Sequence, residues 1–397
     1  MPRTTARYKS LPEYLLASMP QKKRDLLAKG VDVIDLGAGD ADLAPPIEAV
    51  EALEKAAHNP SMSRYGFGLG LPAFRDAVSR WMHRRFGLTF DPLKEVVPLI
   101  GSKEGIAHLA LAYVGHGDIA LIPEPGYLAY LGGSLLSEGD VHTVALRPRT
   151  NFLLELDEVS TDVLKRTRLV YLNYPNNPTA AIAPRDYLER TVKRCREYDI
   201  LLVYDNAYSE LAFDGYVPPR IFEIEGARDV AIEFHSLSKT YNMTGWRCGW
   251  AVGSPEIAGT LAKVKSFVDT GQFMAVQAAG IAALDAWETF LPGNLKIFAE
   301  RRDASVAAFN EAGFPCVAPQ ATMYLWLRLP EGLPSAVFAE RLLTEEGVVV
   351  LPGSALGAGG EGFFRISFIQ SPERIREAAV RAGRVLMSLT DVLAAAK

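Results

Sequence analysis

The sequence predicts an α/β protein whose larger part is a mainly parallel sheet with helices on both faces. Four short apolar runs have the length and composition of buried strands, namely residues 118–122, 168–172, 200–204 and 230–234. Two amphipathic segments with helical periodicity, 106–114 and 185–198, alternate with these runs. Because continuous apolar strands need cover on both faces, this alternation is typical of a parallel sheet between two helical layers.

The carboxyl-terminal part of the chain has a different pattern of predicted helices and strands. A long helical segment is followed by mixed short strands and helices, at residues 295–311, 323–327, 335–344, 348–350 and 363–368, with a final helix after them. Strands and helices that are mixed without strict alternation favour an α+β arrangement. We therefore expect a smaller α+β domain that begins near residue 285.

Composition restricts the classes of function. The chain has 397 residues, of which 49% are hydrophobic and 22% charged, as in ordinary globular proteins. Its net charge of −5 argues against nucleic acid as a partner, and no apolar run approaches the length of a membrane span. Residues 1–20 lack the apolar core of a secretory signal, and an organelle transit peptide is the weaker alternative.

Three widely spaced cysteines and six scattered histidines predict no disulfide framework and no metal site. The pattern favours a reducing cytoplasm as the compartment.

Polar side chains follow three of the predicted strands, where each strand ends. Residues 176–179 (Asn-Asn-Pro-Thr) follow the strand at 168–172, Asp205 and Tyr208 follow the strand at 200–204, and Lys239 follows the strand at 230–234. Open α/β sheets bind ligands at the carboxyl ends of their strands. We therefore expect these side chains to meet at one edge of the sheet.

The segment Ser236-Leu237-Ser238-Lys239, with Arg247 eight residues further on, carries the most chemistry. A lysine amine can hold an aldehyde through a covalent imine, and hydroxyls with a guanidinium can neutralise a phosphate. A turn with a solvated lysine and a structural arginine explains this segment as well when it is taken alone. The alignment of Asn177, Asp205 and Tyr208 with Lys239 favours the imine.

An aldehyde cofactor of this kind needs further partners. A buried carboxylate such as Asp205 would keep a pyridine nitrogen protonated, although a helix-capping aspartate is the alternative. Tyr208 and Asn177 could donate hydrogen bonds to the hydroxyl of the ring. The alternatives are that Tyr208 packs in the core and that Asn177 belongs to an Asn-Pro turn. Backbone N–H groups at Ser102 and Lys103, before a helical segment, could cradle a phosphate, which a plain turn with a serine cap also explains.

Tyr127 and Arg365 complete the candidate set. Tyr127 follows a Pro-Gly pair past a strand end, where it could stack on a flat ring or pack in the core. Arg365 lies in the apolar run 363–368, where an arginine is costly to bury without a partner. A substrate carboxylate or an internal salt bridge could supply that partner.

A nicotinamide cofactor is disfavoured. The G-x-G-x-x-G spacing of dinucleotide folds occurs at Gly357, Gly359 and Gly362, and a second glycine series occurs at Gly66, Gly68 and Gly70. The first series precedes a strand instead of a helix, and the second does not follow a strand, so neither has the required context.

Together these segments resemble the class I/II aminotransferases, pyridoxal phosphate enzymes of fold type I with the aspartate aminotransferase fold. The likeness runs from residues 36–40 (Leu-Gly-Ala-Gly-Asp) to Arg365. It implies a large domain with a mainly parallel seven-stranded sheet and a smaller α+β domain. The implied division is 46–284 for the large cofactor-binding domain, 285–397 for the small domain, and 1–45 for an N-terminal arm with part of the small domain.

The resemblance also implies roles for residues. Lys239 would hold pyridoxal 5'-phosphate, Asp205 would face its pyridine nitrogen, and these two with Tyr208 would be the catalytic residues. Further cofactor contacts are implied for Ser102, Lys103, Tyr127, Asn177, Tyr208, Ser236, Ser238 and Arg247. Substrate contacts are implied for Gly39, Asn177 and Arg365, the last gripping the α-carboxylate. Tyr65 would reach the phosphate of a neighbouring subunit, which implies a homodimer.

Three positions depart from the family pattern. Ala180 stands where a glycine is usual, so the turn at this point is expected to differ slightly. Ala41 replaces a common proline, and Leu356 replaces a frequent aromatic residue. None of these changes removes a catalytic group.

The implied reaction is transfer of an amino group from an L-amino acid to a 2-oxo acid. The layout is nearest to the prokaryotic branch that holds aspartate, alanine and LL-diaminopimelate aminotransferases, and no clear second arginine marks the substrate side chain. A carbon–sulfur β-lyase on the same fold is the alternative enzyme. A non-enzymatic regulator is a further alternative, although the chain shows no added DNA-binding segment.

Overall fold

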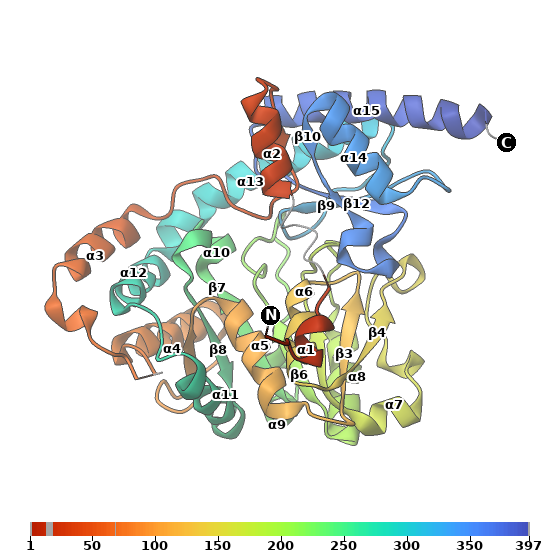
Figure 1. The fold of residues 1–397 in the computed structure, drawn as a ribbon. Helices are drawn as coiled ribbons and strands as arrows, with labels where there is room; N and C mark the ends of the chain where they lie inside the picture. The colour runs from red at the N-terminus through yellow and green to blue at the C-terminus, as the bar shows by residue number, and fades with distance from the viewer. Residues whose placement is uncertain (1, 13–18, 68, 396–397) are drawn as a thin grey trace.

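The centre of the molecule is a seven-stranded sheet with the order β2-β8-β7-β6-β5-β3-β4 (Figure 1). The computed structural model describes residues 2–12, 19–67 and 69–395, so Gly68 of the second glycine series lies outside it. The strands are β2 (Val96–Leu99), β3 (Ile119–Glu124), β4 (Asp140–Ala145), β5 (Thr167–Leu172), β6 (Leu201–Asp205), β7 (Ala231–Ser236) and β8 (Gly249–Gly253). Within this sheet β8 pairs antiparallel with β2 and β7, and the other pairings are parallel. The predicted mainly parallel sheet is confirmed.

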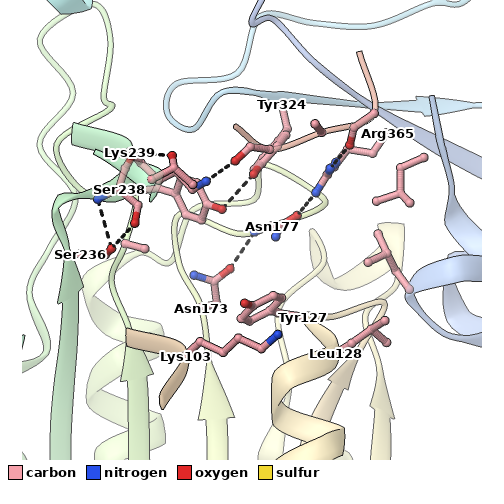
Figure 2. Close-up of a pocket in the computed structure, with 18 of the residues that line it drawn as sticks. Lys103, Tyr127, Leu128, Asn173, Asn177, Ser236, Ser238, Lys239, Tyr324 and Arg365 are labelled. Atoms are coloured by element: carbon pink, nitrogen blue, oxygen red, sulfur yellow. Dashed lines mark hydrogen bonds between the residues drawn. The ribbon is translucent and has the colours of Figure 1, made fainter. Parts of the chain in front are cut away.

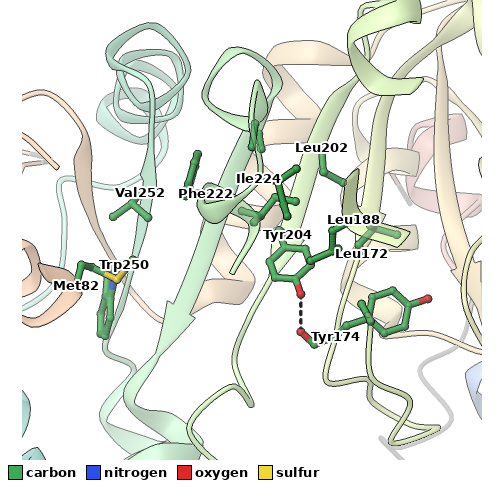
Figure 3. Close-up of a cluster of buried hydrophobic side chains, with 14 of the residues drawn as sticks. Met82, Leu172, Tyr174, Leu188, Leu202, Tyr204, Phe222, Ile224, Trp250 and Val252 are labelled. Carbon is green, nitrogen blue, oxygen red and sulfur yellow. Dashed lines mark hydrogen bonds between the residues drawn. The ribbon is translucent and has the colours of Figure 1, made fainter. Parts of the chain in front are cut away.

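Both faces of the sheet are buried under helices. On β5, Val170 and Leu172 point into one apolar cluster, while Leu169 and Tyr171 point into another on the opposite face. The first face is covered by α4 (Pro72–Phe86), α8 (Arg185–Tyr198) and α12 (Met274–Asp285), and part of this cluster is seen in Figure 3. The second face is covered by α5 (Ser102–Tyr113), α6 (Leu128–Leu136) and α11 (Pro255–Val268). Because helices cover both faces of the sheet, the side chains on both sides of its central strands are mainly apolar.

The carboxyl-terminal part forms a separate core. Its elements are α13 (Trp287–Glu311), β9 (Tyr324–Arg328), α14 (Ser335–Glu346), β10 (Val348–Val349), β11 (Leu351–Pro352), β12 (Phe363–Ser367) and α15 (Pro372–Ala395). Strands β11, β12 and β9 form an antiparallel sheet, and phenylalanines such as Phe309, Phe338 and Phe364 fill the cluster behind it. Figure 1 shows α13 running from α12 towards α15. The division of the chain at residues 45 and 284 stays a prediction.

The N-terminal segment packs against this second core. Strand β1 (Ile34–Asp35) pairs in parallel with β10, and Ile34 and Leu36 are buried among the carboxyl-terminal residues. The remaining helices are α1 (Ala6–Lys9), α2 (Met19–Ala28), α3 (Ile47–Ala57), α7 (Thr161–Arg166), α9 (Ala227–Val230) and α10 (Leu237–Thr240). Because β1 is held by β10, the loop that follows it, residues 36–40, is placed next to the catalytic candidates of the large sheet.

Candidate active site

A cavity of about 480 Å³ lies at the carboxyl ends of β5, β6 and β7. Its lining includes every candidate site residue predicted from the sequence except Tyr65, as Figure 2 shows for part of the set. These lining residues are Gly39, Ser102, Lys103, Tyr127, Asn177, Asp205, Tyr208, Ser236, Ser238, Lys239, Arg247 and Arg365. The expected meeting of strand ends is confirmed, while the role of each residue stays a prediction.

Lys239 extends into the cavity from a short helix. Helix α10 follows β7 directly, and the Ser236 hydroxyl caps it by accepting the backbone N–H of Ser238 at 3.2 Å. The Nζ atom of Lys239 donates to the backbone carbonyl of Gly39, and its side chain is only partly exposed. Lys239 is therefore not a solvated surface lysine. Gly39 leaves no room for a side chain, because a Cβ atom there would lie 2.3 Å from the hydroxyl oxygen of Tyr324.

Asp205 ends β6 with one carboxylate oxygen unpartnered. The Tyr130 hydroxyl donates to its Oδ2 atom at 2.8 Å, whereas Oδ1 is buried and has no hydrogen-bond partner among the residues that the structure describes. Burial raises the pKa of the Asp205 carboxyl group from 3.8 to about 6, and the Tyr130 hydrogen bond and the charge of His235 oppose that rise. A buried acceptor aimed at a cavity fits a cationic N–H of a ligand.

Arg247 places a positive charge at the start of α5. Its guanidinium donates to the carbonyl oxygens of Thr244, at 2.9 Å, and Ile100, at 3.5 Å. No ion pair joins Arg247 to a carboxylate among the described residues. The first turn of α5, with Ser102 at its start, and the hydroxyls of Ser236 and Ser238 line the same space. Helix N-terminal N–H groups, hydroxyls and a guanidinium together suit a phosphate group.

Arg365 is a second cation without an anionic partner. It is 5% exposed, and its two terminal nitrogens donate to the Asn177 side-chain oxygen at 2.7 Å and to the Gly37 carbonyl at 2.6 Å. Within the described part of the chain Arg365 forms no ion pair, so the internal salt bridge considered above is not present. A buried guanidinium that meets only neutral oxygens is suited to an incoming carboxylate.

Aromatic side chains form two sides of the cavity. The Tyr208 hydroxyl lies 2.9 Å from that of Tyr324, and the Arg365 guanidinium lies 4.2 Å from the centre of the Tyr324 ring. Tyr127 makes an edge contact with Tyr130 at 5.6 Å between ring centres, and the Lys103 Nζ atom lies 6.0 Å from the Tyr127 ring centre.

Residues of the site that reasoning from the sequence missed include Asn173, Tyr130 and Tyr324. Asn173 donates to the Asp205 backbone oxygen at 2.7 Å and accepts the Asn177 N–H at 2.8 Å, so it ties two strand ends together. Its position directly after β5 could have identified it. Tyr130 and Tyr324 lie within a helix and a strand, where their sequence neighbours give no sign of a polar role.

Tyr65 lies outside the cavity of its own chain. Its side chain is 71% exposed, and the adjacent exposed ring of Phe67 lies 5.9 Å away between ring centres.

Comparisons with known proteins decide the family. The family model described as aminotransferase class I and II matches residues 31–381. This chain belongs to the class I and II aminotransferases. LL-diaminopimelate aminotransferase of Moorella thermoacetica is 46% identical over 380 residues, which cover 96% of this chain and 97% of that protein. The enzyme of the same name from Aquifex aeolicus is 47% identical over 375 residues, covering 94% and 97%.

Solved structures agree with the family. The substrate-bound BacF structure from Bacillus subtilis has a TM-score of 0.93 and 33% identity, covering 97% of the aminotransferase and 98% of that chain. Aspartate aminotransferase from Thermotoga maritima has a TM-score of 0.89 and 27% identity, covering 97% and 100%. The expected aspartate aminotransferase fold is confirmed, and the protein is a pyridoxal-phosphate-dependent aminotransferase. The curated relatives named here are aminotransferases, so they give no support to the lyase alternative.

The cavity fits pyridoxal phosphate by its own chemistry. The unpartnered Oδ1 atom of Asp205 suits a protonated ring nitrogen, and Arg247 with the α5 N-terminus suits the phosphate. Lys239 presents a primary amine to the same cavity. Of the helices in the described ranges, none has the length and apolar character that a membrane span requires.

Proposed function

We propose that this aminotransferase takes its amino group from LL-diaminopimelate and passes it to a 2-oxo acid, with Lys239 as the residue that binds pyridoxal phosphate. Support for the donor comes from relatives of that name at 44–47% identity over nearly the whole chain. The observation that carries the proposal is the placement of the Lys239 amine, the unpartnered Asp205 oxygen and the unpaired Arg365 guanidinium in one cavity.

Arg365 orients the donor. Its two terminal nitrogens are already directed at oxygen atoms, so a substrate carboxylate can take the place of these neutral partners and add the missing negative charge. The α-amino group then lies toward Lys239, because both Arg365 and Lys239 bond to the loop formed by residues 37–39.

Lys239 moves the proton. When bound, pyridoxal phosphate supplies an aldehyde for the amines and a cationic ring that withdraws electrons from the substrate's α-carbon. With the cofactor bound, the Nζ atom of Lys239 would act as the base that takes the proton from the substrate's α-carbon, and then as the acid that gives this proton up again. Asp205, held by Tyr130 and by Asn173, stabilises the positive charge on the ring nitrogen. Tyr208 and Asn177 would serve the ring oxygen, and Tyr127 would pack against the ring. The phosphate would be held by Ser102, Lys103, Ser236, Ser238 and Arg247, and Gly39 would lie beside the substrate.

The working form is proposed to be a homodimer in the cytoplasm. Tyr65 would reach the phosphate site of the neighbouring subunit, which its 71% exposure permits. The neighbouring ring of Phe67 is also exposed, at 77%. The three cysteines are free, which is compatible with a reducing compartment.

A panel of amino donors with 2-oxoglutarate and pyruvate as acceptors tests the proposal. LL-diaminopimelate is expected to give the highest kcat/KM, and L-glutamate is the product expected with 2-oxoglutarate. A preference for aspartate or alanine over LL-diaminopimelate would contradict the donor. Release of pyruvate and ammonia from cystathionine, without any acceptor, would contradict the transfer reaction.

A further inference from the structure

Two charged residues of the cavity wall have no part in the roles proposed above. Lys23, in α2, and Asp35, at the end of β1, both line the cavity. The Lys23 Nζ atom lies 3.1 Å from the Asp35 Oδ2 atom, and the two side chains are 39% and 18% exposed. Figure 1 shows α2 beside the carboxyl-terminal elements. The cavity wall thus carries one positive and one negative group side by side.

This ion pair lies next to the groups that hold the reacting end of the donor. Asp35 Oδ1 accepts the backbone N–H groups of Gly37 at 2.9 Å and Ala38 at 3.2 Å. The Gly37 carbonyl accepts from Arg365, and the Gly39 carbonyl accepts from Lys239. One short loop therefore connects the Lys23–Asp35 pair to both the carboxylate grip and the reactive amine.

Apolar residues run between the two ends, since Val349 is the strand partner of Asp35 and Leu351 is the strand partner of Arg365. Both line the cavity, together with Val350 and Leu356. An apolar wall suits a run of methylene groups, because burying them there removes apolar surface from water. A donor with a short hydrocarbon chain and a charged far end would match this order of groups.

We propose that Lys23 and Asp35 form the subsite for the far end of the donor, and that this end carries both a carboxylate and an ammonium group. The far carboxylate pairs with Lys23 and the far ammonium pairs with Asp35. A partly exposed ion pair is held only weakly, because water screens it, so it opens readily to admit a zwitterion of matching charges. The inference rests on the proposed function, since Lys239 and Arg365 must hold the reacting end.

The alternatives fit the pair less well. A donor whose far end is apolar would cover two charges without replacing their water. A donor with only a far carboxylate would satisfy Lys23 but meet the like charge of Asp35. The sequence shows no clear second arginine for the far end of the substrate, and Lys23 supplies that positive charge instead.

Three donors separate the two charges experimentally. LL-diaminopimelate carries both groups at its far end, L-2-aminopimelate carries the carboxylate alone, and L-lysine carries the ammonium alone. For each donor we would measure kcat/KM, and also the apparent dissociation constant from the visible spectrum of the pyridoxal-phosphate-loaded protein without acceptor. The variants are Lys23→Gln and Asp35→Asn, the second of which keeps an oxygen to accept the N–H groups of Gly37 and Ala38.

Lys22→Gln is the matched control. Lys22 lies in the same helix but pairs with Glu340 at 3.6 Å and does not line the cavity. Lys23→Gln should weaken LL-diaminopimelate and L-2-aminopimelate roughly tenfold or more relative to L-lysine, which is the loss expected for a hydrogen bond to a charged group. Asp35→Asn should weaken LL-diaminopimelate and L-lysine by a similar factor relative to L-2-aminopimelate.

Equal losses for all three donors in a variant, or no loss beyond that of Lys22→Gln, would overturn the subsite. Failure of the proposed function would look different, because the unaltered protein would then transfer no amino group from LL-diaminopimelate. A visible spectrum typical of the loaded protein in each variant shows that folding and cofactor binding are intact.

Discussion

At the scale of single residues, Asp205 is the clearest case of a side chain whose charge depends on what the cavity holds. Its carboxyl group is buried with its own Oδ1 atom unpartnered among the described residues, and burial raises its pKa to about 6. In the cofactor-free protein the folded state therefore keeps its proton at pH values where the unfolded chain has lost it. Stability from this group is complete below pH 3.8 and is lost as the pH rises through about 6.

Asp205→Asn removes this pH dependence. A rise of the Asp205 pKa from 3.8 to about 6 corresponds to about 3 kcal/mol, so the cofactor-free wild type should lose about that much stability relative to the variant between pH 4 and pH 8. Denaturant unfolding of both proteins across this range measures the difference. The variant should also transfer amino groups far more slowly, since a neutral amide cannot balance the ring nitrogen's charge. A stability difference that does not change with pH would contradict the assigned protonation.

Ala180 holds a backbone conformation that favours glycine. Its φ angle is +58°, and its N–H donates to the Asn176 carbonyl at 2.9 Å in the turn that carries Asn177. The turn thus keeps left-handed backbone angles at this position although glycine is absent.

Replacing Ala180 with glycine should stabilise the fold, because an alanine with these angles costs roughly 1–2 kcal/mol. The greater freedom of glycine in the unfolded chain offsets part of that gain, so we expect about 0.5–1 kcal/mol. Thermal and denaturant unfolding measure it. Ala181→Gly is the neighbouring control and should destabilise; equal effects from both changes would contradict the explanation.

At the scale of elements, the start of α5 depends on one glycine. Gly101 has φ +75°, and a Cβ atom there would lie 2.4 Å from the Arg247 Nη2 atom. Any side chain at this position must therefore displace the guanidinium that we propose to hold the phosphate.

Gly101→Ala should weaken pyridoxal phosphate binding to the cofactor-free protein by roughly tenfold or more, the effect of losing a charged hydrogen bond. Gly117→Ala is the matched control, because Gly117 also has a positive φ, of +84°, but no atom of the described residues would lie within 4 Å of a Cβ at this position. Absorbance titration with the cofactor gives both affinities. If the two variants bind pyridoxal phosphate equally well, the close approach of the Arg247 guanidinium to Gly101 does not matter for cofactor binding, which would contradict this prediction.

The elements that the sequence predicted are those with unbroken apolar or amphipathic patterns. Helix α8 spans the predicted residues 185–198, and β5, β6 and β7 lie within a residue or two of their predicted positions. Strand β8 was not predicted, because glycines begin and end it. Gly249 is needed there, since a Cβ atom would lie 2.6 Å from the His235 carbonyl oxygen.

Two other elements differ for physical reasons that sequence patterns do not show. Strand β2 contains Pro98, which an edge strand tolerates because it lacks a neighbour on one side. Helix α13 begins at Trp287, eight residues before the predicted start, and runs through Pro292. Packing of Leu291 and Asn294 against the rest of the protein outweighs the weak local preference there.

The residues of the candidate site also fall into those that the sequence could predict and those that it could not. Lys239, Asp205 and Asn177 could be predicted because strand ends carry ligand-binding residues in this class of sheet. Tyr324 and Lys23 could not, because they enter the cavity from the carboxyl-terminal part and from α2. Only the packing of these parts over the sheet brings their side chains to the site.

At the scale of the whole molecule, the proposed dimer assigns Tyr65 to the neighbouring site. Tyr65→Ala and Lys239→Ala should each be inactive or nearly so as pure proteins. A mixed dimer would hold one site with Lys239 from the first chain and Tyr65 from the second. Unfolding and refolding the two variants together should therefore restore activity, up to about a quarter of the wild-type value if the chains pair at random.

Sedimentation of the same mixture reports the oligomeric state. If the mixture is only as active as the two separate variants added together, Tyr65 does not act in the site of the neighbouring subunit. A monomer that is fully active would contradict the dimer.

The most direct test of the central claim is to find the lysine that binds the cofactor. Borohydride reduces the carbon–nitrogen double bond between a lysine and pyridoxal phosphate to a stable single bond. After reduction of the loaded protein and digestion, mass spectrometry should find the phosphopyridoxyl group on the peptide that contains Lys239. Lys239→Ala should lose the visible absorbance and leave no labelled peptide. A label on Lys23, Lys103 or any other lysine, with Lys239 unmodified, would contradict the account.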